Sequence, residues 1–539
     1  MAGNAEFTND DLKISTGILD VDGTFNSPNN TTFSDAGRLQ LSGTVSHLGT
    51  MTTTVGTVEY DGGAQDIFDD NYFNLEIDGS GIKTLPQGDI QINGDLSLTA
   101  GSLNYNSNST TSKFIDLKGS VLGTGTITAS RSSIFFISGT GTNQDIRGIS
   151  SDHIGIRLNN SANATTSGDI SIKYLDLLSS STGTFTIDGE TVTINPTGGY
   201  LEMDGGDLTV SSGSLIINST GTTTNELDAG TLTVSGGTVT FTGNNSTNTG
   251  GDFNIDGGTL TVSSGSISIN DQLLVGSGTI NQTGGAIYVD AATNNSHGTG
   301  GNKFDMATGS LILSGGTLYL QSQASSSHKC INIASGVSAS IGSGHTFDIG
   351  TNSTAKNMYF NFGGHSIGNL TVNLPAKGAY LSEDLNIQGN VNIIDGSLIV
   401  DTYNPSVAGS TTVAGTLKIG AGSYDANGTF DASTGTIDFT NGNGQLLVSN
   451  SSVTSFGALD AASGTVVYDG TSAQTIDEAE TFYSLKVDNS SGVTLNEAVG
   501  VNGTLNMTSG NIVNPNDILT VGSSSGAGSI SHTSGIVTG

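Results

Sequence analysis

The stretch MDGGDLTVSSGSLIIN (203–218) indicates the fold class of this 539-residue chain. Apolar residues alternate with polar ones on both sides of a Ser-Ser-Gly turn, and a period of two is typical of a β-strand with one buried face. The pattern recurs in LDAGTLTVSGGTVTFTG (227–243) and in IDGGTLTVSSGSISIN (255–270). A strand-turn-strand unit that recurs in this way indicates a repeat protein.

The spacing of these units indicates coils of variable length. Their opening aspartates, Asp204, Asp228 and Asp256, lie 24 and then 28 residues apart, and a degenerate copy follows at ATGSLILSGGTLYLQ (307–321). Two architectures fit strand-turn-strand repeats of roughly 20–30 residues. One is a β-solenoid, in which each coil stacks on the next, and the other is a string of antiparallel β-sandwich domains.

Three features favour the solenoid. The repeat is shorter than a sandwich domain, and no Pro-rich or charge-rich linker marks a domain boundary. The chain has 6% aromatic residues and no Trp, which suits narrow coils filled by Val, Ile and Leu. We therefore predict an all-β fold, an elongated right-handed parallel β-solenoid of roughly 20–30-residue coils, with a string of β-sandwich domains as the alternative.

The alternation also predicts which side chains face the core. A shift of one residue would instead bury Thr209, Thr233 and Thr261, because neighbouring residues of a strand point to opposite faces. The predicted inward residues are Leu208, Val210, Leu215, Ile217, Leu232, Val234, Val239, Phe241, Leu260, Val262, Ile267 and Ile269.

A longer unit occurs twice. The first copy begins GTVEYDGGAQDIFDDNYFNLEI (56–103) and the second begins GTVVYDGTSAQTIDEAETFYSLKV (464–512). Weaker copies begin near Ser133 and Met358. The matching residues of the two clear copies are Tyr60 with Tyr468, Asp61 with Asp469, Gln65 with Gln474, Leu75 with Leu485, and Asp78 with Asp488.

The repeats suggest how the chain is organised. We expect residues 1–539 to form one continuous repeat rod. The expected sub-regions are leading coils (1–55), a long repeat copy (56–132), a weak long copy (133–200), short tandem repeats (201–322), a weak long copy with leading coils (323–463) and a long copy (464–539).

Composition and charge exclude several classes of protein. Gly shows no three-residue period and Pro numbers only 6, which excludes collagen, and a single Cys excludes a disulfide scaffold. No apolar run approaches the roughly 18 residues of a transmembrane helix, so we expect no membrane insertion. The net charge of -33 makes binding to nucleic acid or anionic lipid improbable, because no basic surface is available to neutralise phosphates.

The long unit carries a pattern of G-T-V-x-Y-[DN]-G followed by Q-x-I, a Y-x-x-L-x-[IV] strand and [IV]-N-G-x-L, here from Gly56 to Leu98 and from Gly464 to Met507. This pattern resembles the repeat regions of large secreted bacterial cell-surface proteins of the Bacteroidota type. The short unit resembles repeats of filamentous-haemagglutinin-like and autotransporter-like β-solenoid adhesins. The resemblance implies display outside the cell, at the cell surface or as a secreted protein.

We accordingly expect a non-enzymatic extracellular structural or adhesive rod, a segment of a bacterial adhesin, stalk or filament. Its expected partners are other copies of itself or neighbouring domains of a longer chain, through end-to-end stacking, and host or surface glycans. The alternative is a carbohydrate-active β-helix protein, such as a polysaccharide lyase or a phage tailspike. A groove with clustered carboxylates and aromatic residues on one face would favour that alternative.

Acidic clusters are the candidate ligand contacts, because carboxylate oxygens suit Ca²⁺. No other cofactor is expected. The chain lacks the EF-hand spacing and the Ca²⁺-binding nonapeptide, and solvated turns whose charges prevent edge pairing are the alternative interpretation. The candidate Ca²⁺ contacts are Asp66, Asp69 and Asp70 in the first long copy and Asp477, Glu478 and Glu480 in the second, with Asp20 and Asp22 as a further acidic pair.

Other chemistry has little support in the sequence. His328-Lys329-Cys330 would place His328 and Cys330 on one face of a strand, yet a buried small cysteine is the simpler interpretation. The seven histidines show no zinc-binding spacing. They are His47, His153, His297, His328, His345, His365 and His532.

Two further expectations concern turns and threonines. Thr-x-Thr runs such as 184–186 and 238–240 raise the possibility of ice binding, but irregular repeat spacing argues against an in-register threonine ladder. The C-terminus stops within a strand-turn-strand pattern, from which we expect a segment of a longer protein. We also expect glycine with a positive φ in the turns Asp22-Gly23, Asp61-Gly62, Asn93-Gly94, Asp469-Gly470 and Asn502-Gly503.

Overall fold

The protein is described from a computed structural model of the 539-residue chain. The described residues are β-strands joined by turns and bends, with no α-helix among them. The structure describes residues 3–7, 10–85, 88–105, 113–141, 143–195, 198–219, 224–243, 251–291, 301–321, 328–350, 356–439, 442–523 and 526–539.

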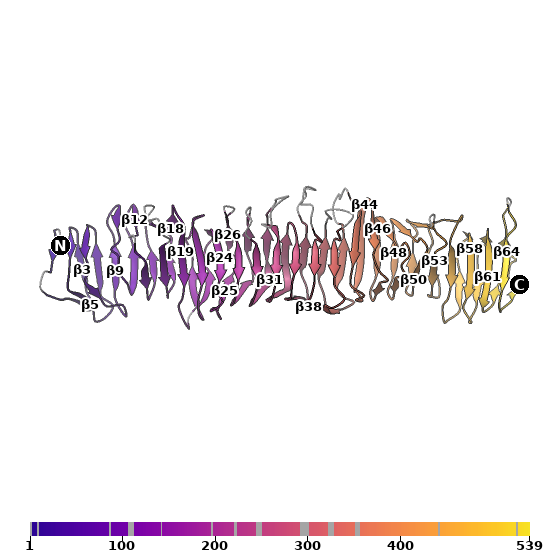
Figure 1. Ribbon diagram of the computed structural model, residues 1–539, viewed down its shortest axis with the longest axis horizontal. Helices are drawn as coiled ribbons and strands as arrows, with labels where there is room; N and C mark the ends of the chain where they lie inside the picture. Colours follow the sequence, from indigo (N-terminus) through magenta and orange to yellow (C-terminus); the bar gives the residue numbers. More distant parts are fainter. Residues whose placement is uncertain are drawn as a thin grey trace. The chain divides into compact units, whose positions relative to one another are not determined.

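The chain divides into two compact units, Met1–Asn270 and Asp271–Gly539. Each unit is a parallel β-solenoid, and the two together make about 23 turns. Figure 1 shows the strands of successive coils lying side by side within each unit. The predicted all-β solenoid is therefore confirmed, and the string of β-sandwich domains is excluded.

The strands of the first unit are β1 (Ala5–Glu6), β2 (Leu12–Ile14), β3 (Ile18–Val21), β4 (Phe25–Asn26), β5 (Asn30–Phe33), β6 (Arg38–Leu41), β7 (Val45–His47), β8 (Thr50–Met51), β9 (Thr57–Tyr60), β10 (Gln65–Asp66), β11 (Asn74–Ile77), β12 (Ile82–Thr84), β13 (Ile90–Ile92), β14 (Leu96–Leu98), β15 (Ser102–Tyr105), β16 (Lys113–Leu117), β17 (Val121–Gly123), β18 (Thr126–Ala129), β19 (Ser133–Ile137), β20 (Asn143–Ile146), β21 (Ile154–Leu158), β22 (Asn163–Thr166), β23 (Ile170–Ile172), β24 (Tyr174–Leu177), β25 (Thr184–Ile187), β26 (Thr191–Ile194), β27 (Leu201–Met203), β28 (Asp207–Val210), β29 (Ser214–Ile217), β30 (Asn225–Leu227), β31 (Thr231–Phe241), β32 (Phe253–Ile255) and β33 (Thr259–Ile269).

The strands of the second unit are β34 (Leu273–Val275), β35 (Thr279–Gln282), β36 (Ala286–Val289), β37 (Phe304–Met306), β38 (Ser310–Leu313), β39 (Thr317–Leu320), β40 (Ile331–Ile333), β41 (Ser338–Ile341), β42 (Thr346–Ile349), β43 (Met358–Asn361), β44 (Asn369–Leu381), β45 (Asn386–Ile387), β46 (Val391–Ile399), β47 (Ser406–Val407), β48 (Thr411–Val413), β49 (Thr416–Lys418), β50 (Ser423–Ala426), β51 (Phe430–Asp431), β52 (Thr436–Asp438), β53 (Gln445–Val448), β54 (Ala458–Leu459), β55 (Thr465–Tyr468), β56 (Gln474–Ile476), β57 (Glu480–Phe482), β58 (Ser484–Asp488), β59 (Val493–Leu495), β60 (Val499–Val501), β61 (Thr504–Ser509), β62 (Ile512–Val513), β63 (Leu519–Val521), β64 (Ser529–His532) and β65 (Val537–Thr538).

Strands pair in parallel with the equivalent strand of the next coil. In the first unit β25 pairs with β28, and β26 pairs with β29. In the second unit β38 pairs with β41, and β39 pairs with β42. Since three strands follow one another before the pairing partner is reached, each of these coils presents three faces, and its backbone hydrogen bonds run to the coils on either side.

The core is built from stacked rows of apolar side chains. Leu208 lies beside Leu232, which lies beside Leu260, and each is fully buried. All twelve residues predicted to face inward are fully buried, whereas Thr209, Thr233 and Thr261 are half-buried on the opposite face. The predicted register of the short repeats is therefore confirmed.

Aromatic residues contribute more to this core than expected. Phe241 stacks on Phe253 with ring centroids 4.7 Å apart, and Tyr60, Tyr72 and Tyr468 are completely buried. Val, Ile and Leu therefore do not fill the coils alone. A coil accommodates a large ring where the coil beside it provides a stacking partner or a smaller side chain.

The prediction of positive φ at the Asp-Gly and Asn-Gly pairs is wrong. The five glycines lie in connections between strands, but none of them has φ in the left-handed region. Close stacking of the coils requires glycine instead. A β-carbon on Gly62 would lie 2.2 Å from the carbonyl oxygen of Ser42 in the preceding coil, and one on Gly94 would lie 2.2 Å from Asn74 Oδ1.

Candidate functional site

The first predicted acidic cluster lies on β10 and the turn that follows it. Asp66 and Asp69 are exposed, and Asp70 is half-buried. Burial, followed by the nearby charge of Asp69, raises the pKa of the Asp70 carboxyl. Between these aspartates, the backbone of Phe68 is held from inside the coil, since its N–H donates to the Tyr60 hydroxyl at 3.0 Å. The turn is therefore anchored while two of its carboxylates face solvent.

The second cluster has the same exposure but different contacts. Asp477 and Glu478 are exposed, and Glu480 is half-buried. Asp477 accepts hydrogen bonds from Thr475 Oγ1 at 2.7 Å and from Asn496 Nδ2 at 2.6 Å. Burial, followed by the charge of Glu478, raises the pKa of the Glu480 carboxyl. The two hydrogen bonds to Asp477 hold a segment in which all three titratable side chains of the cluster are acidic.

A small cavity of about 10 Å³ lies beneath this second cluster. Asp477, Glu478 and Glu480 line it together with Tyr468. The Tyr468 side chain is fully buried, and its hydroxyl makes no hydrogen bond among the described residues. Burial raises the pKa of this hydroxyl, so it remains protonated and keeps its donor.

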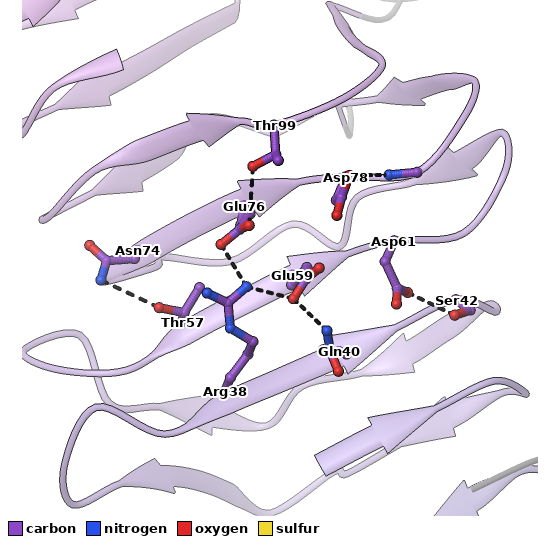
Figure 2. Close-up of polar contacts among 11 residues, drawn as sticks. Arg38, Gln40, Ser42, Thr57, Glu59, Asp61, Asn74, Glu76, Asp78 and Thr99 are labelled. Atoms are coloured by element: carbon purple, nitrogen blue, oxygen red, sulfur yellow. Dashed lines mark hydrogen bonds and ion pairs between the residues drawn. The ribbon is translucent and has the colours of Figure 1, made fainter. Parts of the chain in front are cut away.

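The closest group of acidic side chains was not predicted from the sequence. Within the described residues, Glu59, Glu76 and Asp78 form an acidic trio in which one carboxylate oxygen from each residue lies within 4.8 Å of the other two. Arg38 Nη1 lies 2.6 Å from Oε2 of both Glu59 and Glu76. Figure 2 shows the guanidinium in contact with both carboxylates. Gln40 donates to Glu59 Oε2 at 2.8 Å. The two glutamates lie side by side in register on β9 and β11, and the guanidinium compensates their repulsion.

This cluster has the chemistry of a structural ion pair. The side chain of Glu59 is 4% exposed, and its hydrogen bond with Arg38 is the main reason why the pKa of the guanidinium is raised. A divalent cation would have to displace the arginine to reach both glutamates. Ca²⁺ binding at the predicted clusters stays a prediction. Asp20 and Asp22 are both exposed, on β3 and in the bend that follows.

Cys330 and His345 are both buried within the described part of the chain. Cys330 is fully buried, its thiol donates to the Tyr359 carbonyl at 3.2 Å, and burial raises its pKa to about 12. This matches the simpler interpretation of a buried small residue. His345 is fully buried, and burial lowers its pKa to about 4. His297 lies outside the described residues.

Sequence reasoning missed the role of the glutamine in the long repeat. Gln474 is fully buried, and its Nε2 donates to the carbonyls of Val448 and Asn450 in the preceding coil, both at 2.7 Å. Its Oε1 accepts from Gly470 N at 2.9 Å. This one amide therefore closes its own turn and ties it to the coil before. The available signal was that a glutamine follows the Asp-Gly turn in both clear copies, three residues after the glycine in the first and four residues after it in the second.

The irregular spacing of the repeats was expected to prevent an in-register ladder of threonines, and this expectation is wrong. Five threonines on neighbouring coils of the first unit lie in register, although the repeats differ in length. The extra residues fall in the connections between strands, so they do not shift the ladder. The threonines are Thr165, Thr186, Thr209, Thr233 and Thr261.

The second unit contains a groove of about 790 Å³ that crosses β44, β46, β49 and β52. Its lining includes one row of small residues aligned in register, Gly378, Ser397, Thr416 and Thr436. A second aligned row consists of Tyr380, Ile399 and Lys418. The groove therefore runs across the strands and along the stack of coils.

Charged and aromatic side chains border this groove. Lys377, Lys418, Asp395 and Asp401 line it, so its formal charges cancel. The ring of Tyr380 stacks on Tyr359, with centroids 4.6 Å apart and planes inclined by 18°. Carboxylates and an aromatic residue are thus gathered on one face, which the sequence did not reveal and which is the arrangement expected of the carbohydrate-active alternative.

Two residues of the groove have strained backbones. Ala376 has φ of 58° and Asp401 has φ of 53°. Both line the groove, and a non-glycine residue in this region costs on the order of 1 kcal/mol or more. Strain of this kind tends to be retained at binding sites, where the surrounding structure maintains it.

Comparison with known protein families, curated proteins and solved structures finds no match for this chain. The resemblance to secreted bacterial repeat proteins therefore stays a prediction. Within the described part of the chain, no helix has the length and hydropathy that crossing a membrane would require.

Proposed function

We propose that this chain is a non-enzymatic structural or adhesive segment of an extracellular bacterial surface protein. The observation that carries the proposal is the coil-to-coil stacking itself. Apolar rows run from coil to coil inside each unit, and the outer faces carry polar rows in the same register. A stack of this kind offers long regular faces for contact.

The charge of the chain supports display in solvent. Its net charge of -33 opposes side-by-side association through self-repulsion. We propose that association instead proceeds end to end, with other copies or with neighbouring domains of a longer chain. Electron microscopy with and without Ca²⁺ tests this, and lateral bundles in low salt without divalent cations would contradict it.

Localisation is the primary test of the proposed function. Intact producing cells are treated with a protease, and the chain is then followed with an antibody raised against it. We expect loss of the full-length signal, while a cytoplasmic protein in the same cells stays intact. Full protection in intact cells, with digestion only after lysis, would contradict surface display.

A second candidate function is the binding of ice, and the ladder of five threonines favours it. Neighbouring threonines on the ladder are separated by the strand spacing of about 4.8 Å, which gives a regular row of hydroxyl and methyl groups. Such a row can hold ordered water at a repeating distance. If this candidate is correct, the chain inhibits ice recrystallisation. Replacing Thr209 and Thr233 with tyrosine would then abolish the inhibition, whereas Thr412→Tyr in the second unit would not.

A further inference from the structure

We propose that the groove across β44, β46, β49 and β52 binds a neutral, linear polysaccharide. The inference rests on the proposed adhesive function and assigns it a site and a ligand class. Four successive coils contribute to the groove, so at the strand spacing it extends about 14 Å along the stack. An extended chain of sugar rings fits a trough of this form better than a compact ligand does.

The backbone around the groove argues against a peptide strand as the ligand. An extended peptide binds by adding to a free sheet edge. Here β46 is already paired with β44 on one side and with β48 and β49 on the other, and β49 is also paired with β52. The strands beneath the groove therefore have no free edge to offer.

The lining also argues against an apolar helix. Its aligned small row offers the hydroxyl groups of Ser397, Thr416 and Thr436, and Asn357 lies at the border. Asn357 Oδ1 already accepts from Gly378 N at 3.0 Å, which leaves its Nδ2 group available as a donor. Helix-binding grooves are hydrophobic, whereas sugar hydroxyls need both donors and acceptors.

The charges select a neutral ligand. Lys377 and Lys418 are balanced by Asp395 and Asp401, and Lys418 Nζ also lies 2.9 Å from Asp438 Oδ2. Lysines in this groove can donate to sugar oxygens and the aspartates can accept from sugar hydroxyls. A polyanion would meet two carboxylates and a chain with a net charge of -33.

Tyr380 gives the groove a rigid contact. Stacking on Tyr359 fixes its ring, and Ile399 lies beside it in register. Because an immobilised ring loses little further entropy on binding, its edge and hydroxyl form a preorganised contact for a sugar ring. The Tyr288–Tyr319 pair of the same unit is a matched stack outside the groove, with centroids 4.5 Å apart.

The test measures binding of the full chain to neutral linear polysaccharides (a glucan, a mannan, a galactan and a xylan) and to polygalacturonate. Affinity electrophoresis and calorimetry give the affinity, and new reducing ends report cleavage. We expect retention by at least one neutral polysaccharide without cleavage. Tyr380→Ala should weaken binding roughly tenfold, and Thr416→Phe should weaken it through steric blockage. Tyr319→Ala, which breaks the matched stack, should leave the affinity unchanged.

Several results would overturn the inference. These are binding to none of the neutral polysaccharides, equal binding by the Tyr380 and Tyr319 variants, or preference for polygalacturonate. Cleavage of any of these polysaccharides would establish the carbohydrate-active alternative in place of an adhesive site. The protease experiment on intact cells is independent of all these results. Surface display without glycan binding would therefore reject this site and leave the proposed function standing.

Discussion

The two copies of the long repeat, residues 56–103 and 464–512, close their coils in the same way. Gln65 Nε2 donates to the carbonyls of Leu41 and Gly43 at 2.7 and 2.8 Å. Gln474 makes the corresponding two bonds in the second copy. The hydrogen bonds that join one coil to the next are thus retained where much of the surrounding sequence has changed.

The inside of the coil differs between the copies. In the first, the hydroxyl groups of Tyr60 and Tyr72 lie 3.2 Å apart, and Tyr72 donates to the Phe68 carbonyl at 2.6 Å. In the second, Phe482 occupies the place of Tyr72, and the Tyr468 hydroxyl has no protein partner among the described residues. The second copy therefore has one hydroxyl fewer, and its buried Tyr468 hydroxyl is left without a protein partner among the described residues. The comparison teaches that the repeat conserves contacts between coils more strictly than contacts within one coil.

The largest expected effect concerns the shared anchor. Replacing Gln474 with Ala removes two donated and two accepted hydrogen bonds and should destabilise the turn by about 3 kcal/mol. Gln65→Ala should have a smaller effect in the same direction, since Gln65 is only half-buried. Hydrogen exchange of peptides covering each turn measures both. Unchanged exchange in both variants would contradict the role of the glutamine as the anchor of the turn.

The next effect concerns glycine. Gly62→Ala forces a β-carbon against the Ser42 carbonyl and should cost about 2 kcal/mol, by analogy with overpacking of a core. Gly63→Ala is the matched control, because its β-carbon would lie 3.9 Å from the nearest atom, the Ser80 carbonyl oxygen. Thr471 follows the Asp-Gly pair in the second copy, where Gly63 follows it in the first. Urea midpoints of the two variants should therefore differ, and equal midpoints would exclude close stacking as the reason for glycine.

A smaller gain is expected from converting the second copy toward the first. Phe482→Tyr adds a hydroxyl at the position aligned with Tyr72, whose hydroxyl lies 3.2 Å from that of Tyr60 in the first copy, and should raise local stability by about 1 kcal/mol. Slower hydrogen exchange around residues 464–482 would show the gain. Faster exchange would mean that the core of the second copy does not accommodate the added oxygen.

The smallest effect is a pH dependence shared by both copies. Burial raises the pKa of Asp70 and of Glu480, so ionisation of each group opposes folding. This cost is absent below the ordinary carboxyl range near pH 4 and develops as pH rises through the folded-state pKa. Because both groups are half-exposed, Glu480→Gln should stabilise by only about 0.5 kcal/mol at pH 7 and by nothing at pH 3. Urea titrations at the two pH values test this, and an equal gain at both would contradict it.

The sequence was sufficient to predict the solenoid and its buried rows. The pleat of a strand has a period of two, so Leu208 and Val210 could be assigned to the core without knowing their partners. The reason for glycine at position 62 could not be read in this way, because the limiting contact is a carbonyl 20 residues earlier. The groove around Tyr380 carries no motif, since its lining comes from four coils and depends on how their connections fold back.

The lack of a partner for the Tyr468 hydroxyl among the described residues could be predicted from the sequence only in part. Aligning the two copies places Phe482 opposite Tyr72, so the missing partner was visible in the sequence. The consequence of this difference for the Tyr468 hydroxyl could not be predicted, because the contact between Tyr60 and Tyr72 exists only in the folded coil. The same reasoning applies to the threonine ladder, whose register is hidden by connections of unequal length.

The central claim is that the two long copies share their contacts between coils but differ in the hydrogen bonds inside the coil. The most direct test is a pair of matched substitutions, Tyr60→Phe and Tyr468→Phe, followed by hydrogen exchange of the corresponding peptides. Tyr60→Phe removes a bonded hydroxyl and should destabilise the first copy by about 1 kcal/mol. Tyr468→Phe removes a buried hydroxyl without a protein partner and should stabilise the second copy by up to about 1 kcal/mol. Opposite signs would support the account. Equal destabilisation of both copies would contradict it.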